Sequence, residues 1–179
     1  MRPITTTTFL LACLSIVFLS SAALAQGDKS SRPSPPATAS GKVGKANVTI
    51  SYSSPSVKGR KVWGDLVPYG KVWRAGANEA TIFTSDADLT IQGKKLPAGK
   101  YSLFAIPGEN EWTFIFNSET GQWGIKRGGD ANLDRAKDVL TVTAKPKKSS
   151  SFNEKMLFEV TGSGFSFKWE NIEVPVAAN

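Results

Sequence analysis

The stretch of chain at residues 58–79 is the densest group of side chains suited to recognition. Its seven candidate site residues are Arg60, Trp63, Tyr69, Trp73, Arg74, Asn78 and Glu79. Aromatic faces stack on the apolar face of a sugar ring, while arginine, amide and carboxylate groups supply directional hydrogen bonds. Because long irregular segments of β-rich domains lie at the surface and carry binding groups, this stretch predicts a cleft that binds a glycan.

The same residues also have a structural interpretation. Trp63 and Trp73 would then fill the hydrophobic core, and Arg74 would pair with Glu79 to hold a long loop in place. Both interpretations stay open at this level, because residue types and spacing alone do not distinguish an exposed indole from a buried one.

Histidine and cysteine, which many hydrolases use as base or nucleophile, are both missing from the predicted mature chain. The sequence has no histidine, and its one cysteine, Cys13, falls in a predicted signal peptide. This excludes Ser-His-Asp triads, Cys-His nucleophiles, disulfides, and zinc or copper sites built on imidazole or thiolate. We therefore predict no catalytic residue and no cofactor.

One enzymatic alternative is a hydrolase that uses carboxylates alone. Glycoside hydrolysis needs two carboxyl groups roughly 5–10 Å apart, one of them with a raised pKa. The acids near aromatic segments are Asp65, Glu79, Glu109 and Glu111. Their spacing along the chain does not show that any two of them converge.

A calcium site is a weaker alternative. Asp130, Asn132 and Asp134 place oxygens at alternate positions, as calcium-binding loops do. However, Arg135 stands where the helix-loop-helix calcium motif has glycine, and Thr141 stands where it has glutamate. A polar turn is the simpler interpretation, and we predict no metal site.

The first 25 residues predict a cleaved secretory signal peptide. Arg2 precedes an 11-residue, mostly apolar run at 9–19, and Ala23-Leu24-Ala25 fits the A-x-A cleavage pattern. The run is too short for a bilayer, which takes roughly 20 residues to cross, so we expect no stable membrane span after cleavage. The predicted location is the periplasm or the extracellular space.

The chain is basic, with 22 Lys and Arg against 15 Asp and Glu and a net charge of +7. In an exported protein this charge favours anionic envelope surfaces or glycans as partners, and we expect no nucleic acid. Solubility alone also explains such a charge.

The mature chain divides into a lead-in and one domain. Residues 26–44 are rich in Ser and Pro without apolar periodicity, which predicts a tether or irregular lead-in. From 45 to 176 apolar and polar residues alternate, and a run at 100–106 that is apolar on both faces predicts a central buried strand. Further strands are expected near 46–52, 80–84, 89–91, 112–117, 122–126, 139–144, 156–161, 165–170 and 172–176. We expect an all-β fold, a single-domain β-sandwich or jelly roll of about eight to ten short strands.

Several motifs of this domain resemble a bacterial family, domain of unknown function 2911. They are SPSVKGRKVWG at 54–64, LVPYGKVWRAGANE at 66–79, LPAGKYSLF at 96–104, IPG at 106–108, WT at 112–113 and QWG at 122–124. Members of that family are typically exported, so the resemblance implies the same location and domain extent here. It implies no activity, cofactor or catalytic residue.

Together these patterns predict an exported, single-domain β-sandwich that binds a glycan or another envelope ligand without catalysis. A structural or protein-interaction module of the envelope and the carboxylate-dependent hydrolase stay as alternatives.

Overall fold

The computed structural model describes residues 28–179, so the predicted signal peptide at 1–25 lies outside the described residues. The described chain contains ten strands and two short 3₁₀ helices. The strands are β1 (Pro36–Val43), β2 (Ala46–Ser53), β3 (Thr81–Ser85), β4 (Leu89–Ile91), β5 (Lys94–Leu96), β6 (Gly99–Ile106), β7 (Trp112–Asn117), β8 (Asp138–Ala144), β9 (Lys147–Thr161) and β10 (Gly164–Ala177), and the helices are η1 (Lys29–Ser31) and η2 (Arg135–Lys137). The predicted all-β sandwich is confirmed. No helix within residues 28–179 has the length and hydrophobicity needed to cross a membrane.

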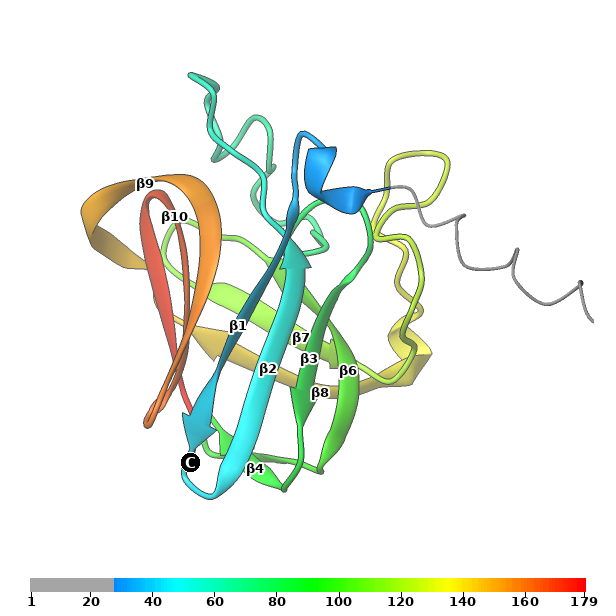
Figure 1. Ribbon diagram of the computed structural model, residues 1–179, viewed down its shortest axis with the longest axis vertical. Helices are drawn as coiled ribbons and strands as arrows, with labels where there is room; N and C mark the ends of the chain where they lie inside the picture. Colours follow the sequence, from blue (N-terminus) through cyan, green and yellow to red (C-terminus); the bar gives the residue numbers. More distant parts are fainter. Residues whose placement is uncertain (1–27) are drawn as a thin grey trace, which may run out of the picture.

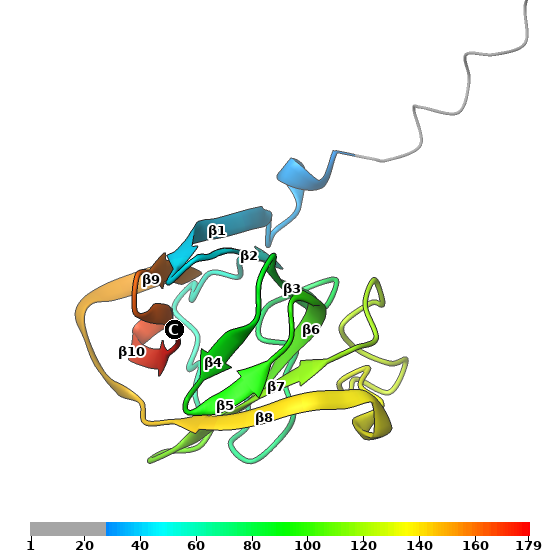
Figure 2. The same ribbon diagram turned by 90° about the horizontal axis from the view of Figure 1, so that it is seen from below.

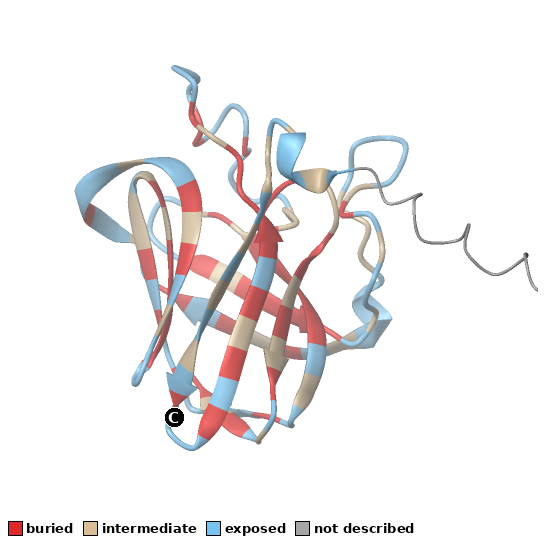
Figure 3. Cartoon of the chain, viewed as in Figure 1, coloured by how far each residue is buried: buried red, intermediate tan, exposed pale blue. Residues whose placement is uncertain are grey.

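Six strands form one antiparallel sheet in the order β1-β2-β3-β6-β7-β8 (Figure 1). A tight turn joins β1 to β2, and Gly44 occupies it with a left-handed φ of 56°, which glycine adopts without steric cost. Burial alternates along β2, where Val48 and Ile50 are buried while Asn47 and Ser51 are exposed (Figure 3). This alternation is the one that the sequence predicts for a strand with one face toward a core.

The long β9–β10 hairpin covers one face of this curved sheet (Figure 2). β1 lies beside β9 so closely that a Cβ atom built on Gly41 would be 3.1 Å from the carbonyl oxygen of Val160. The short β4–β5 hairpin is tied to the C-terminus, because Thr90 and Asn179 exchange two backbone hydrogen bonds of 2.7 and 3.0 Å. The hairpins thus close the sheet into a sandwich.

Aromatic side chains fill the space between the sheet and the β9–β10 hairpin. Those of β7 and β10 are all at most 3% exposed: Trp112, Phe114, Phe116, Phe165, Phe167 and Trp169. Many of their ring pairs meet edge to face or at a tilt, the arrangements that aromatic quadrupoles favour. This is the main core of the protein.

The opposite face of the sheet carries a second and much smaller cluster. Phe104 of β6 and Ile115 of β7 pack there with Ala80, and β6 is buried on both faces as predicted. Two long connections cover this cluster: the first loop, residues 54–80 between β2 and β3, and the second loop, residues 118–134 between β7 and η2. These two loops position the candidate site.

The structure differs from the sequence-based expectation in several elements. Strand β5 is not expected from the sequence, β9 begins at Lys147 rather than near 156, and the strands expected at 165–170 and 172–176 are one strand, β10. Part of the expected irregular lead-in, at 26–44, is strand β1. Its inward side chains are the small residues Ala37 and Ala39, which alternate with Thr38 and Ser40 and therefore hide the period of two. The strand expected at 122–126 is absent, and that stretch makes only isolated bridges within the second loop region and to Glu79.

Candidate functional site

A cleft of about 710 Å³ lies where the first and second loops meet. Figure 1 shows the ribbon of both loops. One wall is formed by the first loop, through Pro55, Arg60 and the residues from 66 to 77 other than Tyr69 and Ala75. The other wall consists of Ile125, Gly129, Asp130, Ala131, Leu133 and Arg135, and Ser34 and Trp169 complete the lining. The cleft therefore combines parts of the chain that are far apart in sequence.

Backbone hydrogen bonds hold the first loop against the strands. Trp73 and Ala105 of β6 exchange two of them, at 2.7 and 2.8 Å, and Met156 of β9 donates one to the carbonyl oxygen of Pro55 at 2.9 Å. Ala75 is fully buried with a left-handed φ of 50°, an unfavourable conformation for a residue with a Cβ atom. The loop is therefore held in a defined shape, although it has no regular secondary structure.

The two tryptophans of the predicted site have different environments. Trp63 is 7% exposed and packs edge to face against Trp112 and Trp169, so it belongs to the core. Trp73 is half-buried: its ring stacks on Trp169 at 6.0 Å between centroids, yet it also lines the cleft. The structural interpretation applies to Trp63, whereas Trp73 has a place in both the core and the cleft.

Arg74 lines the cleft with a half-buried side chain and no acidic partner. No acceptor within residues 28–179 lies within hydrogen-bond distance of its buried Nε, and no described carboxylate forms an ion pair with it. Burial lowers the pKa of its guanidinium. The predicted pair between Arg74 and Glu79 does not form.

Glu79 is instead bound by the segment before β1. Arg32 Nη1 donates to both carboxylate oxygens at 3.0 Å, and Lys29 Nζ lies 3.1 Å from Oε1. Next to it, Asn78 Nδ2 donates to the carbonyl oxygen of Ser34 at 3.0 Å. We call these contacts the N-terminal clasp; they hold Asn78 and Glu79 away from the lining of the cleft.

The clasp sets the charge state of Glu79. Burial alone would raise the pKa of this carboxyl, but hydrogen bonds from its own backbone amide, Arg32 and Lys29 lower that pKa to about 2. Glu79 is therefore an anion at any physiological pH.

The two remaining predicted residues lie at different distances from the cleft. Arg60 lines it, with Nε donating to the carbonyl oxygen of Val57 at 3.0 Å and Nη2 to that of Ser56. Tyr69 is 37% exposed and is not part of the lining. Burial and the nearby Glu109 and Glu170 carboxylates raise the pKa of its hydroxyl.

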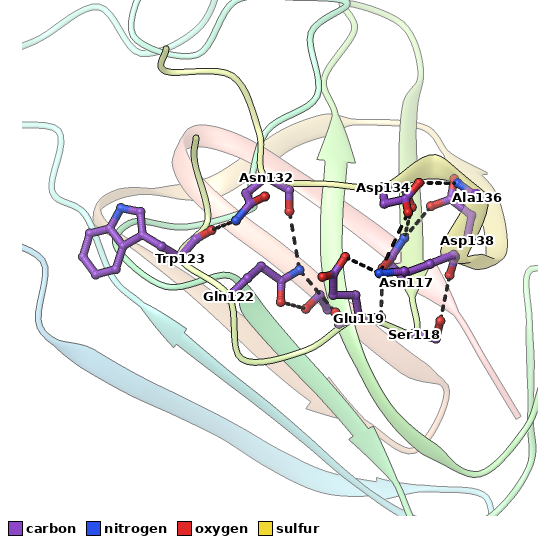
Figure 4. A network of polar contacts seen from close by, with 11 residues as sticks. Asn117, Ser118, Glu119, Gln122, Trp123, Asn132, Asp134, Ala136 and Asp138 are labelled. Carbon is purple, nitrogen blue, oxygen red and sulfur yellow. Dashed lines mark hydrogen bonds and ion pairs between the residues drawn. The ribbon is translucent and has the colours of Figure 1, made fainter. Parts of the chain in front are cut away.

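Polar contacts among side chains and backbone groups shape the second loop (Figure 4). Asn117 Nδ2 at the end of β7 donates to the carbonyl oxygen of Asp134 at 2.8 Å and to Asp138 Oδ1 at 2.9 Å. Asn132 Nδ2 donates to the carbonyl oxygen of Trp123 at 3.0 Å. These bonds fix the base of the loop against β7 and hold its far side as the second wall.

Asp130, Asn132 and Asp134, the three residues considered above as calcium ligands, have other contacts in the structure. Asn132 makes the contact just described, and Asp134 Oδ1 accepts from the backbone amide of Ala136 at 3.0 Å, which caps η2. Asp130 lines the cleft. Within residues 28–179 no group of three or more Cys, Asp or Glu side chains is arranged to hold a metal ion.

The cleft is electropositive. Arg60, Lys71, Arg74 and Arg135 line it, and Asp130 is its one carboxylate. Arg135 is paired with Asp138, and Arg60 is bonded to backbone carbonyls, so these two cations already have acceptors. Lys71 and Arg74 have no acidic partner among the described residues.

Neither Trp169 nor the second wall is predicted from the sequence as part of a ligand cleft, although Asp130 is named there as a possible calcium ligand. Ile125 lies where a strand is expected, and Trp169 belongs to the aromatic stripe of β10. The glycine at 124 was the available signal, because in a loop a glycine often marks close approach of the backbone to another group.

Comparison with known proteins identifies a family without adding a function. No curated protein and no solved structure matches the chain significantly. A family model described as protein of unknown function (DUF2911) matches residues 34–178. This match confirms the resemblance predicted from the sequence, and the chain belongs to the DUF2911 family.

Proposed function

We propose that the protein is an exported, non-catalytic domain that binds a glycan or another envelope component in the cleft between its two long loops. The observation that carries the proposal is the cleft itself, whose lining includes both Trp73 and Arg74; the buried Nε of Arg74 has no hydrogen-bond partner among residues 28–179. Its volume of about 710 Å³ lies within the range of small-ligand sites, roughly 300–1,000 Å³.

The composition of the lining suits a sugar. Trp73, Val72 and Leu133 offer apolar surface for the C–H face of a sugar ring, and Arg60, Lys71 and Arg74 offer donors for its oxygens. Such a mixture of a mostly apolar wall and a few directional polar groups is typical of ligand pockets.

The acids of the region support binding rather than glycoside hydrolysis. That reaction needs a pair of carboxyl groups, one with a raised pKa, whereas Asp130 is the one carboxylate in the lining. Glu79 is outside the lining, and its pKa is lowered to about 2, opposite to what a proton donor requires.

Export rests on the N-terminal pattern. The apolar run at 9–19 and the small residues at 23–25 support a cleaved signal peptide. Placed outside the cytoplasm, a basic cleft would meet the glycans and acidic polymers of the envelope.

The proposal is tested with an immobilised panel of neutral and acidic oligosaccharides and the chain purified after export. Wild type is compared with Trp73→Ala and with Trp123→Ala, a matched control because Trp123 is 48% exposed and does not line the cleft. We expect the Trp73 variant to bind at least about tenfold more weakly, about 1.4 kcal/mol, and the Trp123 variant to bind like wild type.

Because Trp73 also packs against the core, each variant is first checked for a cooperative thermal transition. Lys71→Ala is a second variant that leaves the core intact, since Lys71 is exposed. If the wild-type chain bound no oligosaccharide of the panel, the proposal would be overturned. If all variants bound equally, the binding site would not be this cleft.

A further inference from the structure

Arg74 is a half-buried cation of the cleft, and no acceptor among residues 28–179 lies within hydrogen-bond distance of its buried Nε. Buried or partly buried charges are normally paired, because removal from water is costly without a compensating anion or hydrogen bonds. Arg60 and Arg135, by contrast, are exposed, and each still has acceptors on its own loop or beside it. Arg74 is therefore the exception that calls for an explanation.

The nearest acid along the same loop cannot supply this compensation. Glu79 is five positions from Arg74, but Lys29 and Arg32 occupy its two carboxylate oxygens. The N-terminal clasp thus neutralises the acid of the first loop with two cations from elsewhere. The result is that the positive charge of Arg74 stays available to the cleft.

The position of the Arg74 side chain is fixed by close packing against the second loop. A Cβ atom on Gly124 would lie 2.2 Å from Arg74 Cδ and 2.9 Å from Arg74 Cβ, so only glycine leaves room for the arginine. Gly124 is itself held, because its amide donates to the carbonyl oxygen of Asn78 and its carbonyl accepts from Asn132, both at 3.0 Å. The two loops together form a groove for the arginine stem.

Such a fixed arginine is suited to a planar oxyanion. A guanidinium binds a carboxylate through two parallel hydrogen bonds, and a group that is already held in place loses less conformational freedom on binding. Lys71, which forms no ion pair with a carboxylate of residues 28–179, adds positive charge on the same wall. Asp130 is the single acid that would repel an anion there, and it is exposed.

We infer that the ligand presents an oxyanion, carried by a carboxylate or a phosphate group, to the guanidinium of Arg74, while its carbon skeleton rests on the apolar wall beside Trp73. This inference rests on the proposed function and narrows its ligand class from glycans in general to acidic ones. Arg74 is then the residue that determines specificity, and Gly124 is the residue that positions it.

The test uses three probes with the chain purified after export, measured by titration calorimetry at low salt. The probes are a trisaccharide of galacturonic acid, the same trisaccharide with its carboxyl groups as methyl esters, and inorganic phosphate. We expect the acid to bind at least about tenfold more tightly than the ester, because the ester keeps the sugar rings and loses the charge. Competition by inorganic phosphate would identify phosphate as an alternative source of the oxyanion.

Two variants test whether the preference for the acid over the ester depends on Arg74. Arg74→Gln is expected to bind acid and ester equally, and Gly124→Ala to lose most of the preference through displacement of Arg74. Arg127→Gln is the matched control, since it removes the same charge from the second loop outside the lining; it is expected to keep the wild-type ratio. The comparison of acid with ester on wild type needs no variant and is therefore independent of folding defects.

The outcomes separate the two proposals. Equal affinity of wild type for acid and ester would overturn the inference and leave the proposed function standing. A preference for the acid that survives in Arg74→Gln would overturn the assignment to Arg74. Failure of acid, ester and phosphate alike to bind would overturn the inference, and the oligosaccharide panel would then decide the proposed function separately.

Discussion

The two faces of the main sheet are built in contrasting ways. On one face, β9 and β10 bury a continuous aromatic core that includes Trp112, Phe167 and Trp169. On the other face, Phe104 and Ile115 support a small cluster under two loops. The cleft opens beside this cluster and is also lined by Trp169 of the aromatic core. The contrast indicates that one face provides most of the stability, while the other holds polar groups in arrangements that stability alone would not favour.

The largest expected effect is on the aromatic face. Phe167→Ala should lower the free energy of unfolding by about 3–5 kcal/mol, because it removes a fully buried ring and leaves a cavity. Leu133→Ala, on the loop face, should lower it by only about 1 kcal/mol, since Leu133 is half-buried. Urea unfolding followed by circular dichroism measures both. Equal losses would contradict the division between the two faces.

A second prediction concerns the contact between the two loops. Gly124→Ala should lower the free energy of unfolding by about 1–3 kcal/mol through overpacking against Arg74. Gly128→Ala is the control, because a Cβ atom there meets nothing within 4 Å; its effect should stay within about 0.5 kcal/mol. Unfolding in urea compares the pair, and a Gly124→Ala protein as stable as wild type would show that the loops are not tightly packed.

A third, smaller effect is expected from the N-terminal clasp. Because the clasp is partly exposed to solvent, Glu79→Gln should cost only about 0.5–1 kcal/mol at neutral pH and less in high salt. The pKa of Glu79 is about 2 in the fold against an ordinary value of 4.5, so the anion is favoured by folding. The stabilisation is therefore fully present above about pH 4.5 and is lost as the pH falls through about 2.

Thermal unfolding of wild type and Glu79→Gln between pH 7 and pH 2 checks this prediction, with Asp65→Asn as the control for an exposed acid outside the clasp. The difference between wild type and Glu79→Gln should shrink toward low pH. If the difference in stability between wild type and Glu79→Gln stayed constant with pH, the charge of the Glu79 carboxylate would not contribute to stability.

The smallest stability effect is expected at Arg74. Arg74→Met should change the free energy of unfolding by no more than about 0.5 kcal/mol or raise it slightly. It replaces a half-buried charge that has no partner among residues 28–179 with an apolar chain of similar length. Arg32→Met, which removes a paired arginine from the clasp, is the comparison and should destabilise. A loss above about 2 kcal/mol in Arg74→Met would mean that the protein itself satisfies this arginine.

The sequence predicts the sandwich better than it predicts the cleft. The alternation of Val48 and Ile50 and the apolar run of β6 carry the strand signal locally, because side chains on a strand point to opposite faces. The sequence does not predict β1, because its inward residues, Ala37 and Ala39, differ too little in size and hydrophobicity from the Ser and Thr residues beside them.

The site depends on contacts over long sequence distances, which residue types do not reveal. The sequence predicts that the first loop carries the ligand site, but it does not predict which residue binds Glu79 of that loop. That residue is Arg32, 47 positions away. This distant contact replaces the expected pair between Arg74 and Glu79. Likewise, Trp169 reaches the cleft from a strand whose pattern indicates only a core position.

The most direct way to test whether Arg74 binds the oxyanion of the ligand is to observe the Arg74 side chain by NMR. In a nitrogen-15 NMR spectrum of the chain purified after export, the Nε–H signal of Arg74 is assigned by its absence in Arg74→Lys. We predict that this signal shifts and saturates as the galacturonic acid trisaccharide is added, and that it stays unchanged with the methyl ester. A signal unmoved by the acid at concentrations that saturate binding would contradict the account.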